Sequence, residues 1–92
     1  KKPTAIFVAS DMQALSVMKV ARQMSLRIPD DLAVVGFDDI DVAEDVDLTT
    51  IRQHLDESGR LAVEILLARV ADANRPLQNI NLSLKLIERL TS

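Results

Sequence analysis

The chain has 92 residues, enough for one hydrophobic core, because a domain this small buries only roughly 60 to 65% of the surface that its unfolded chain exposes. Apolar residues make up 48% of the sequence and charged residues 27%, a balance that indicates a folded globular domain and argues against disorder. Fourteen acidic and eleven basic residues give a net charge of −3, so the chain lacks the excess of Lys and Arg that a DNA-binding surface needs.

Membrane insertion and export are not indicated by the sequence. No apolar run approaches the roughly 18 to 20 residues that a membrane-spanning helix needs, and the Lys1-Lys2-Pro3 start is not followed by a signal-peptide pattern. The absence of cysteine excludes disulfides, thiolate nucleophiles and most structural zinc sites. We expect a cytoplasmic location.

The first 37 residues have the pattern of a βαβ unit. Residues 4–9 form an apolar run rich in β-formers, which predicts a strand covered on both faces, as in parallel sheets. Ser10 can cap a helix over residues 11–25, with Gln13 placed as in a capping box. Residues 32–37 predict a second buried strand, and such units connect right-handedly into parallel strands. The predicted class is α/β.

The second half of the chain is more varied. Six of the ten residues from 38 to 47 are acidic, which predicts a surface loop or a short irregular helix, and residues 48–51 should be extended. A second helix should open at Asp56 or Glu57 and end near Asn74, before a proline. Residues 80–86 alternate strictly between apolar and polar, as in an edge strand or one exposed by truncation. One complete βαβ unit is too little for a covered sheet, so we expect a fragment of something larger.

Three segments carry a family resemblance: residues 9–11 (Ala-Ser-Asp), 34–39 (Val-Val-Gly-Phe-Asp-Asp) and 48–53 (Leu-Thr-Thr-Ile-Arg-Gln). In their order and separations they resemble the LacI/GalR (lactose and galactose repressor) family of transcription regulators. Residues 86–92, with Glu88-Arg89 and a closing Ser, resemble the end of the family pattern. The likeness covers essentially the whole chain.

The resemblance implies a type I periplasmic-binding-protein-like (Rossmann-like) module with two α/β lobes, an effector in the cleft between them, a dimer, and an N-terminal helix-turn-helix that reads DNA. This chain would be the C-terminal part of the effector-binding and dimerisation domain, without the DNA-binding head and the first lobe. The helix at about residues 57–73 would belong to that first lobe. We therefore expect an effector-sensing segment of a repressor that responds to a small polar metabolite, such as a sugar, and that contacts DNA only through the missing N-terminal domain.

Departures from the family pattern bear on the effector. The family usually has Asn at the position of Ser10, and often Met and Gly at those of Gln13 and Ser16. Ahead of residues 48–50 it commonly has an aromatic residue and a proline, where this chain has Val46 and Asp47. These differences leave the fold prediction intact and the effector class open.

Asp38 is the leading candidate for an effector contact. It follows a predicted parallel strand, where open α/β sheets place their ligand crevice, and a carboxylate can accept hydrogen bonds from two hydroxyls. Composition alone favours a solvated loop aspartate, whereas the resemblance at residues 36–38 favours the contact. Ser10, at the end of the other strand, can both cap its helix and face the crevice, and Gln53 matches a family position at the crossover between lobes. Asp39 is expected to support the turn, and Asp11 to interact with the helix dipole.

Residues Leu15, Met18 and Lys19 are the candidates for a dimer interface. The apolar side of the first predicted helix is wider than a sheet contact alone requires, and the family's matching helix lies at the dimer interface. A wide apolar stripe also fits a simple core.

The sequence shows no group of residues with the types and spacing of a catalytic site or a metal site. The carboxylates of residues 38–47 have neither the alternate spacing nor the internal glycine of a calcium loop, and His54 has no cysteine or helical carboxylate partner. We expect no enzyme, metal or cofactor. Two alternatives stay open: an exported solute-binding protein of a transport system with the same fold, and a receiver-like signalling domain, for which Lys85 is poorly placed.

Overall fold

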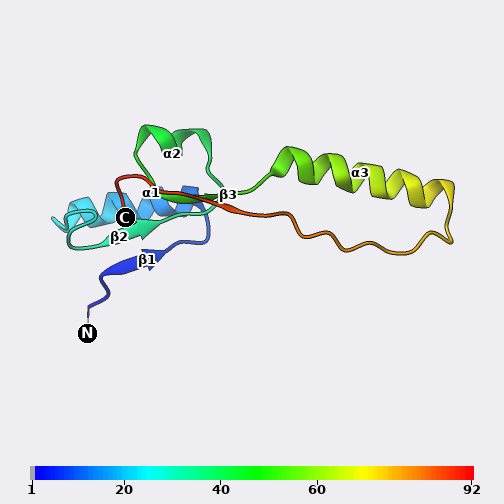
Figure 1. Ribbon diagram of the computed structural model, residues 1–92. Coiled ribbons are helices and arrows are strands. Elements are labelled where there is room, and N and C mark those ends of the chain that lie inside the picture. The colour runs from blue at the N-terminus through cyan, green and yellow to red at the C-terminus, as the bar shows by residue number, and fades with distance from the viewer. Residues whose placement is uncertain (1) are drawn as a thin grey trace. The chain divides into compact units, whose positions relative to one another are not determined.

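The structure is a computed structural model that describes residues 2–92. The chain divides into two compact units: unit 1 comprises the chain up to Arg52 together with Lys85–Ser92, and unit 2 comprises Gln53–Leu84. Figure 1 labels the three helices and the first three strands.

Unit 1 contains the predicted βαβ arrangement. Strand β1 (Ala5–Phe7), helix α1 (Asp11–Gln23) and strand β2 (Ala33–Val35) follow one another, and β1 and β2 pair in parallel with Ala5 opposite Ala33. Each strand is shorter than its apolar run, because regular pairing covers only three residues of each. The prediction of an α/β class with a parallel sheet is confirmed.

Helix α1 begins at the predicted residue. Ser10 has extended backbone angles, and its Oγ accepts a hydrogen bond from the Gln13 amide at 3.2 Å, which satisfies one of the free amides of the first turn. The helix ends two residues before the predicted position. There Ser25 adopts a left-handed conformation with φ of 57°, and the Leu26 amide donates back to the Ala21 carbonyl at 2.9 Å.

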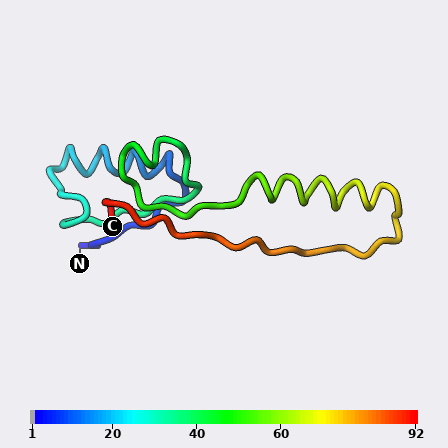
Figure 2. Tube along the Cα trace, turned by 45° about the horizontal axis from the view of Figure 1, so that its top comes forward, coloured from blue at the N-terminus to red at the C-terminus, as the bar shows by residue number. Residues whose placement is uncertain are grey.

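Strand β3 (Thr50–Arg52) lies beside β2, through parallel bridges that join Val35 to Thr49 and Asp38 to Arg52. Strand β4 (Lys85–Ile87) pairs antiparallel with β3. The strand predicted over residues 80–86 is thus confirmed only in its last part, because regular pairing with β3 begins at Lys85. Figure 2 shows the chain returning along β3 and ending inside unit 1.

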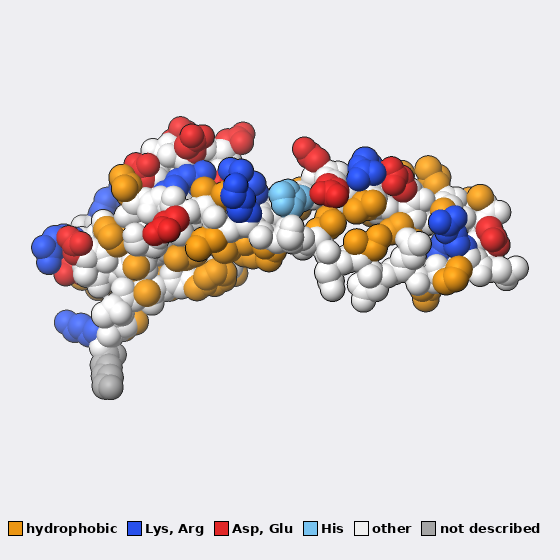
Figure 3. Space-filling model, viewed as in Figure 1, with side chains coloured by type: hydrophobic (Ala, Val, Ile, Leu, Met, Phe, Trp, Pro, Cys, Tyr) orange, Lys and Arg blue, Asp and Glu red, His pale blue; other side chains and the backbone are white. Residues whose placement is uncertain are grey.

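The core of unit 1 lies between α1, β2 and the acidic segment. Its buried apolar side chains are Val8, Ala14, Met18, Val34, Ala43 and Leu48. The acidic segment folds into the short helix α2 (Asp41–Asp45), one of the two predicted forms, and Ala43 is fully buried. Acidic side chains gather on the surface over α2 (Figure 3), so the segment contributes one small apolar side chain to the core and keeps its charges in solvent.

The prediction that β1 is covered on both faces is wrong for this chain. Phe7 is 63% exposed and Ile6 37% exposed, although Phe7 packs edge-on against Phe37 with 6.5 Å between ring centroids. Within residues 2–92 only β2 pairs with β1, so one edge of β1 and part of its surface stay open. Apolar atoms are visible over the sheet of unit 1 in Figure 3.

Unit 2 consists of helix α3 (Leu55–Ala71) and a return segment, residues 72–84, that runs back along it (Figure 2). The helix was predicted correctly in its position but ends three residues before Asn74. None of its residues is buried, and Leu66 and Val70 are 62% and 76% exposed. In residues 2–92 we find no helix with the length and apolar character required to cross a membrane.

Candidate functional site

The carboxyl ends of β1, β2 and β3 meet at one edge of unit 1. Just beyond β1 and β2, the Asp11 amide donates to the Phe37 carbonyl at 2.9 Å. Between the segment that follows β2 and strand β3, the Asp38 amide donates to the Ile51 carbonyl at 2.9 Å. In open α/β sheets this edge is where ligands bind, so the residues that follow the three strands define the candidate site.

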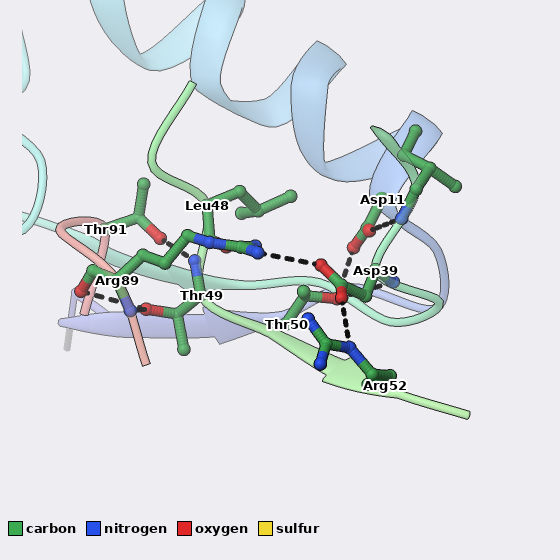
Figure 4. Close-up of polar contacts among 9 residues, drawn as sticks. Asp11, Asp39, Leu48, Thr49, Thr50, Arg52, Arg89 and Thr91 are labelled. Atoms are coloured by element: carbon green, nitrogen blue, oxygen red, sulfur yellow. Dashed lines mark hydrogen bonds and ion pairs between the residues drawn. The ribbon is translucent and has the colours of Figure 1, made fainter. Parts of the chain in front are cut away.

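Asp11 is the buried centre of this edge. Its side chain is fully buried and accepts hydrogen bonds from the Thr50 hydroxyl at 2.6 Å and from the Ile40 amide at 2.9 Å. It stands in the first turn of α1, as expected for a residue that interacts with the helix dipole. Its carboxylate also joins the start of α1 to β3 and to the loop after β2 (Figure 4). The sequence did not indicate this second role.

Gly36 makes room for that carboxylate. A Cβ atom at position 36 would overlap Asp11 Oδ1 and would lie 3.1 Å from a methyl carbon of Leu48. The glycine is required here for close approach of a side chain to the backbone, because its φ is not in the left-handed region.

Two consecutive aspartates form an unusual turn at the end of this edge. Asp38 has φ of 121° and Asp39 has φ of 55°. Positive φ is uncommon for residues other than glycine, although aspartate tolerates the left-handed region better than most. Such strained positions are concentrated at binding and catalytic sites. The turn holds Asp38 partly buried at the predicted position beyond β2.

The structure brings two of the three predicted effector-binding residues to this edge. Ser10 and Asp38, both partly buried, follow β1 and β2 and belong to unit 1. Gln53 is the first residue of unit 2, where it lines a hollow of about 210 Å³ with His54, Ser58 and Asn81 among others. His54 is exposed, in agreement with its reading as a polar loop residue.

Asp39 holds two arginines. Its Oδ2 lies 2.6 Å from Arg52 Nε, and its Oδ1 lies 3.0 Å from Arg89 Nη2 (Figure 4). The Asp39 side chain is 9% exposed. Burial raises the pKa of Asp39, but the hydrogen bonds and charges of Arg52 and Arg89 outweigh it and hold the pKa below its ordinary value. Asp39 thus supports the turn, as expected, and its partners are the part that the sequence did not reveal.

The last residues of the chain complete this side of unit 1. The Thr91 hydroxyl donates to the Val34 carbonyl at 2.7 Å and accepts from the Thr49 amide at 2.8 Å. The Thr49 hydroxyl in turn accepts from the Arg89 amide at 2.8 Å. These buried threonines fix the C-terminal segment against β2 and the start of β3, and so they place Arg89 beside Asp39.

The three interface candidates do not occupy equivalent positions. Leu15 is partly buried and Lys19 is exposed, whereas Met18 is 7% exposed and belongs to the core. The side of α1 that faces solvent instead carries Met12 and Val20, which are 64% and 50% exposed. Among residues 2–92 we find no group of three or more side chains suited to hold a metal ion.

Known proteins share this architecture. The chain matches the periplasmic binding protein-like domain over residues 1–92, and it therefore belongs to that family. The Ribose operon repressor of Escherichia coli (strain K12) is 38% identical over 90 residues, which cover 96% of the chain and 27% of the repressor. The chain thus spans about a quarter of the length of the curated relatives it matches.

Solved structures agree. One is a LacI family transcriptional regulator from Enterococcus faecium with bound ribose. The match covers all of this chain and 35% of the regulator's chain, with a TM-score of 0.88 and 26% identity. Another is the dimeric Lac repressor with an 11-residue C-terminal deletion. The match covers 98% of this chain and 34% of the repressor's chain, with a TM-score of 0.85 and 34% identity. The similarity to LacI/GalR repressors that the motifs predicted is confirmed, and these relatives are transcription regulators, not enzymes.

Proposed function

We propose that this chain supplies one wall of the effector pocket of a cytoplasmic transcription repressor, and that the effector is a small polar metabolite, most simply a sugar. The observation that carries the proposal is the meeting of Ser10 and Asp38 at the carboxyl edge of parallel strands, in a chain whose relatives include a ribose operon repressor and a regulator with bound ribose.

The chemistry of the edge suits a polyol. The carboxylate of Asp38 can accept hydrogen bonds from two neighbouring hydroxyls, and charged acceptors give short, directional bonds. The Ser10 hydroxyl, already used as an acceptor for the Gln13 amide, keeps its proton for donation. Gln53, next along the chain after β3, is a third candidate contact in the complete protein.

DNA binding is assigned to another part of the protein. The net charge of −3 and the acidic surface over α2 oppose contact with phosphates (Figure 3). The effector would act by binding more tightly to one arrangement of the lobes than to the other, because a ligand shifts a conformational equilibrium only through such a difference in affinity. The exposed leucines and valines of α3 would pack in the complete protein against a first lobe outside this chain.

Dimerisation is proposed through α1, with Leu15 and Lys19 at the contact and Met18 supporting it from the core. Leu15→Asp in the complete protein should convert the dimer to a monomer in sedimentation velocity, because a buried unpaired carboxylate is costly at an apolar contact. Asp45→Asn, on the exposed surface of α2, serves as a control. A Leu15→Asp protein that sediments as a dimer would refute this assignment.

The effector assignment is tested by calorimetry on the complete protein. We expect at least one of D-ribose, cellobiose and sucrose to bind the wild type, and Asp38→Ala to weaken that binding by at least about tenfold, or about 1.4 kcal/mol. Asp41→Ala, which removes an exposed carboxylate three residues away, should leave the affinity unchanged. Equal affinities of wild type and Asp38→Ala would sink the role of Asp38.

A DNA readout tests the regulatory part of the proposal. Operator fragments from the region upstream of the gene should bind the complete wild-type protein, and the sugar identified by calorimetry should change that affinity. If the wild type binds none of the sugars and no upstream DNA, the proposed function is wrong.

A further inference from the structure

Asp39 lies where three segments of unit 1 that are distant in sequence meet. Its own backbone forms the left-handed turn after β2, Arg52 is the last residue of β3, and Arg89 comes from the C-terminal segment 50 residues away. Figure 4 shows the Asp39 carboxylate between the two guanidinium groups, one oxygen toward each. Arg52 binds Oδ2 and Arg89 binds Oδ1, so each carboxylate oxygen of Asp39 accepts a hydrogen bond from a different arginine.

The hydrogen bonds around this carboxylate extend to the backbone of the turn. The Asp39 amide donates to the Thr50 hydroxyl at 3.3 Å, and the same hydroxyl donates to the buried carboxylate of Asp11. Arg89 Nη1 donates to the Leu48 carbonyl at 2.9 Å, so the Arg89 side chain is held at two points. The turn is therefore held by two sets of contacts: the hydrogen bonds with Thr50 and Asp11, and the ion pairs of Asp39 with the two arginines.

We propose that Asp39, with Arg52 and Arg89, forms a clamp that positions the Asp38 side chain for the effector, which makes Arg89 of the C-terminal segment a positioning residue of the site. The inference rests on the proposed function of Asp38. A left-handed turn of two aspartates is conformationally costly unless its surroundings determine it, and the Asp39 clamp supplies those surroundings. At metal sites, loss of an outer-shell partner that orients a ligand typically lowers affinity by about 10- to 100-fold, and we expect a loss at the lower end of that range when the residues that orient Asp38 are changed.

The two arginines are not equivalent within the Asp39 clamp. The Arg89 side chain is 14% exposed and has a second acceptor, whereas the Arg52 side chain is 45% exposed. An ion pair open to solvent is screened by water and contributes little, and a shielded one contributes more. Loss of Arg89 should therefore disturb the turn more than loss of Arg52 does.

The chain offers a matched control in a second aspartate and arginine pair. Asp31 accepts bonds from Arg27 Nε and Nη2, each at 3.2 Å, with side chains that are 34% and 74% exposed. This pair joins residues four apart in the loop before β2 and involves none of the residues of the candidate site. Asp31→Asn therefore removes one carboxylate charge from an arginine pair without touching the Asp39 clamp.

The experiment compares Asp39→Asn, Arg89→Gln, Arg52→Gln and Asp31→Asn in the complete protein. Asparagine at position 39 removes the charge and keeps a residue that tolerates left-handed angles. Hydrogen exchange is followed in peptides that cover residues 38–40 and 88–90, and D-ribose, cellobiose and sucrose are titrated by calorimetry.

We expect Asp39→Asn and Arg89→Gln to speed exchange in both peptides by about tenfold and to weaken sugar binding by about tenfold. Arg52→Gln should have a smaller effect and Asp31→Asn none. Arg89→Lys keeps the positive charge but has a single donor nitrogen in place of the two that Arg89 uses, so it should weaken sugar binding less than Arg89→Gln does.

The outcomes separate the two proposals. Exchange and affinity in Asp39→Asn that match those of Asp31→Asn would overturn the clamp, and so would faster exchange spread evenly over unit 1, which would indicate general destabilisation. If the wild type binds none of the three sugars, the clamp is decided by the exchange of the two peptides alone. If it also binds no upstream DNA, the proposed function fails.

Discussion

Replacement of Asp11 by alanine should destabilise unit 1 more than any substitution of an exposed carboxylate. The Asp11 side chain is fully buried and receives two hydrogen bonds, at 2.6 Å from Thr50 and at 2.9 Å from the Ile40 amide. Hydrogen bonds to a charged group contribute about 1.5 to 3 kcal/mol each, and part of that is offset because alanine no longer buries a charge. We expect a net loss of about 3 kcal/mol. At about 2 to 4 °C per kcal/mol for a domain of 150–250 residues, the Tm should fall by roughly 6 to 12 °C.

Thermal unfolding of the complete protein, followed by circular dichroism, measures this loss. Thr50→Val removes the hydroxyl that donates to Asp11 and that also accepts from the Asp39 amide. Because the bond to Asp11 is lost in both single variants, the double variant Asp11→Ala/Thr50→Val should be less destabilised than the sum of the two. Asp45→Ala, which removes an exposed carboxylate on α2, should leave the Tm unchanged. Additive effects of Asp11→Ala and Thr50→Val would refute the reasoning, because they would mean that the two side chains do not interact.

Three further outcomes follow from the same edge. Gly36→Ala should lower the Tm by several degrees, because the new methyl group must displace the Asp11 carboxylate; an unchanged Tm would contradict the close approach. Ser10→Ala should cost about 1 kcal/mol in thermal unfolding through loss of the bond from the Gln13 amide, whereas Ser10→Asn should keep the cap and remain near the wild-type Tm. The low pKa of Asp39 means that its contribution to stability is complete above the unfolded-state pKa of about 4 and is lost as the pH falls through the lower folded-state pKa. The difference in urea midpoint between wild type and Asp39→Asn should therefore be constant from pH 5 to 7 and shrink below pH 4; a difference that grows in acid would contradict the assignment.

Local chemistry made the elements of unit 1 predictable. The cap at Ser10, the apolar runs before and after α1 and the parallel pairing of β1 with β2 depend on neighbouring residues and on simple periodicity. The strand at residues 80–86 was predicted too long, because alternation marks a face that could be buried and does not identify a pairing partner. The exposure of Phe7 shows the same limit, since an apolar run cannot show whether another strand is present to cover it.

The sequence by itself determined the class of the fold, the family resemblance and the positions of Ser10 and Asp38 at the ends of parallel strands. Only the tertiary structure showed that Asp11 is buried at that edge and that Gly36, which has no side chain, leaves room for its carboxylate. It also showed that Arg89 contacts Asp39, which is 50 residues earlier in the chain. The physical reason is that caps and strand ends arise from contacts within a few residues, whereas a buried carboxylate and its donors come together only after distant segments have packed.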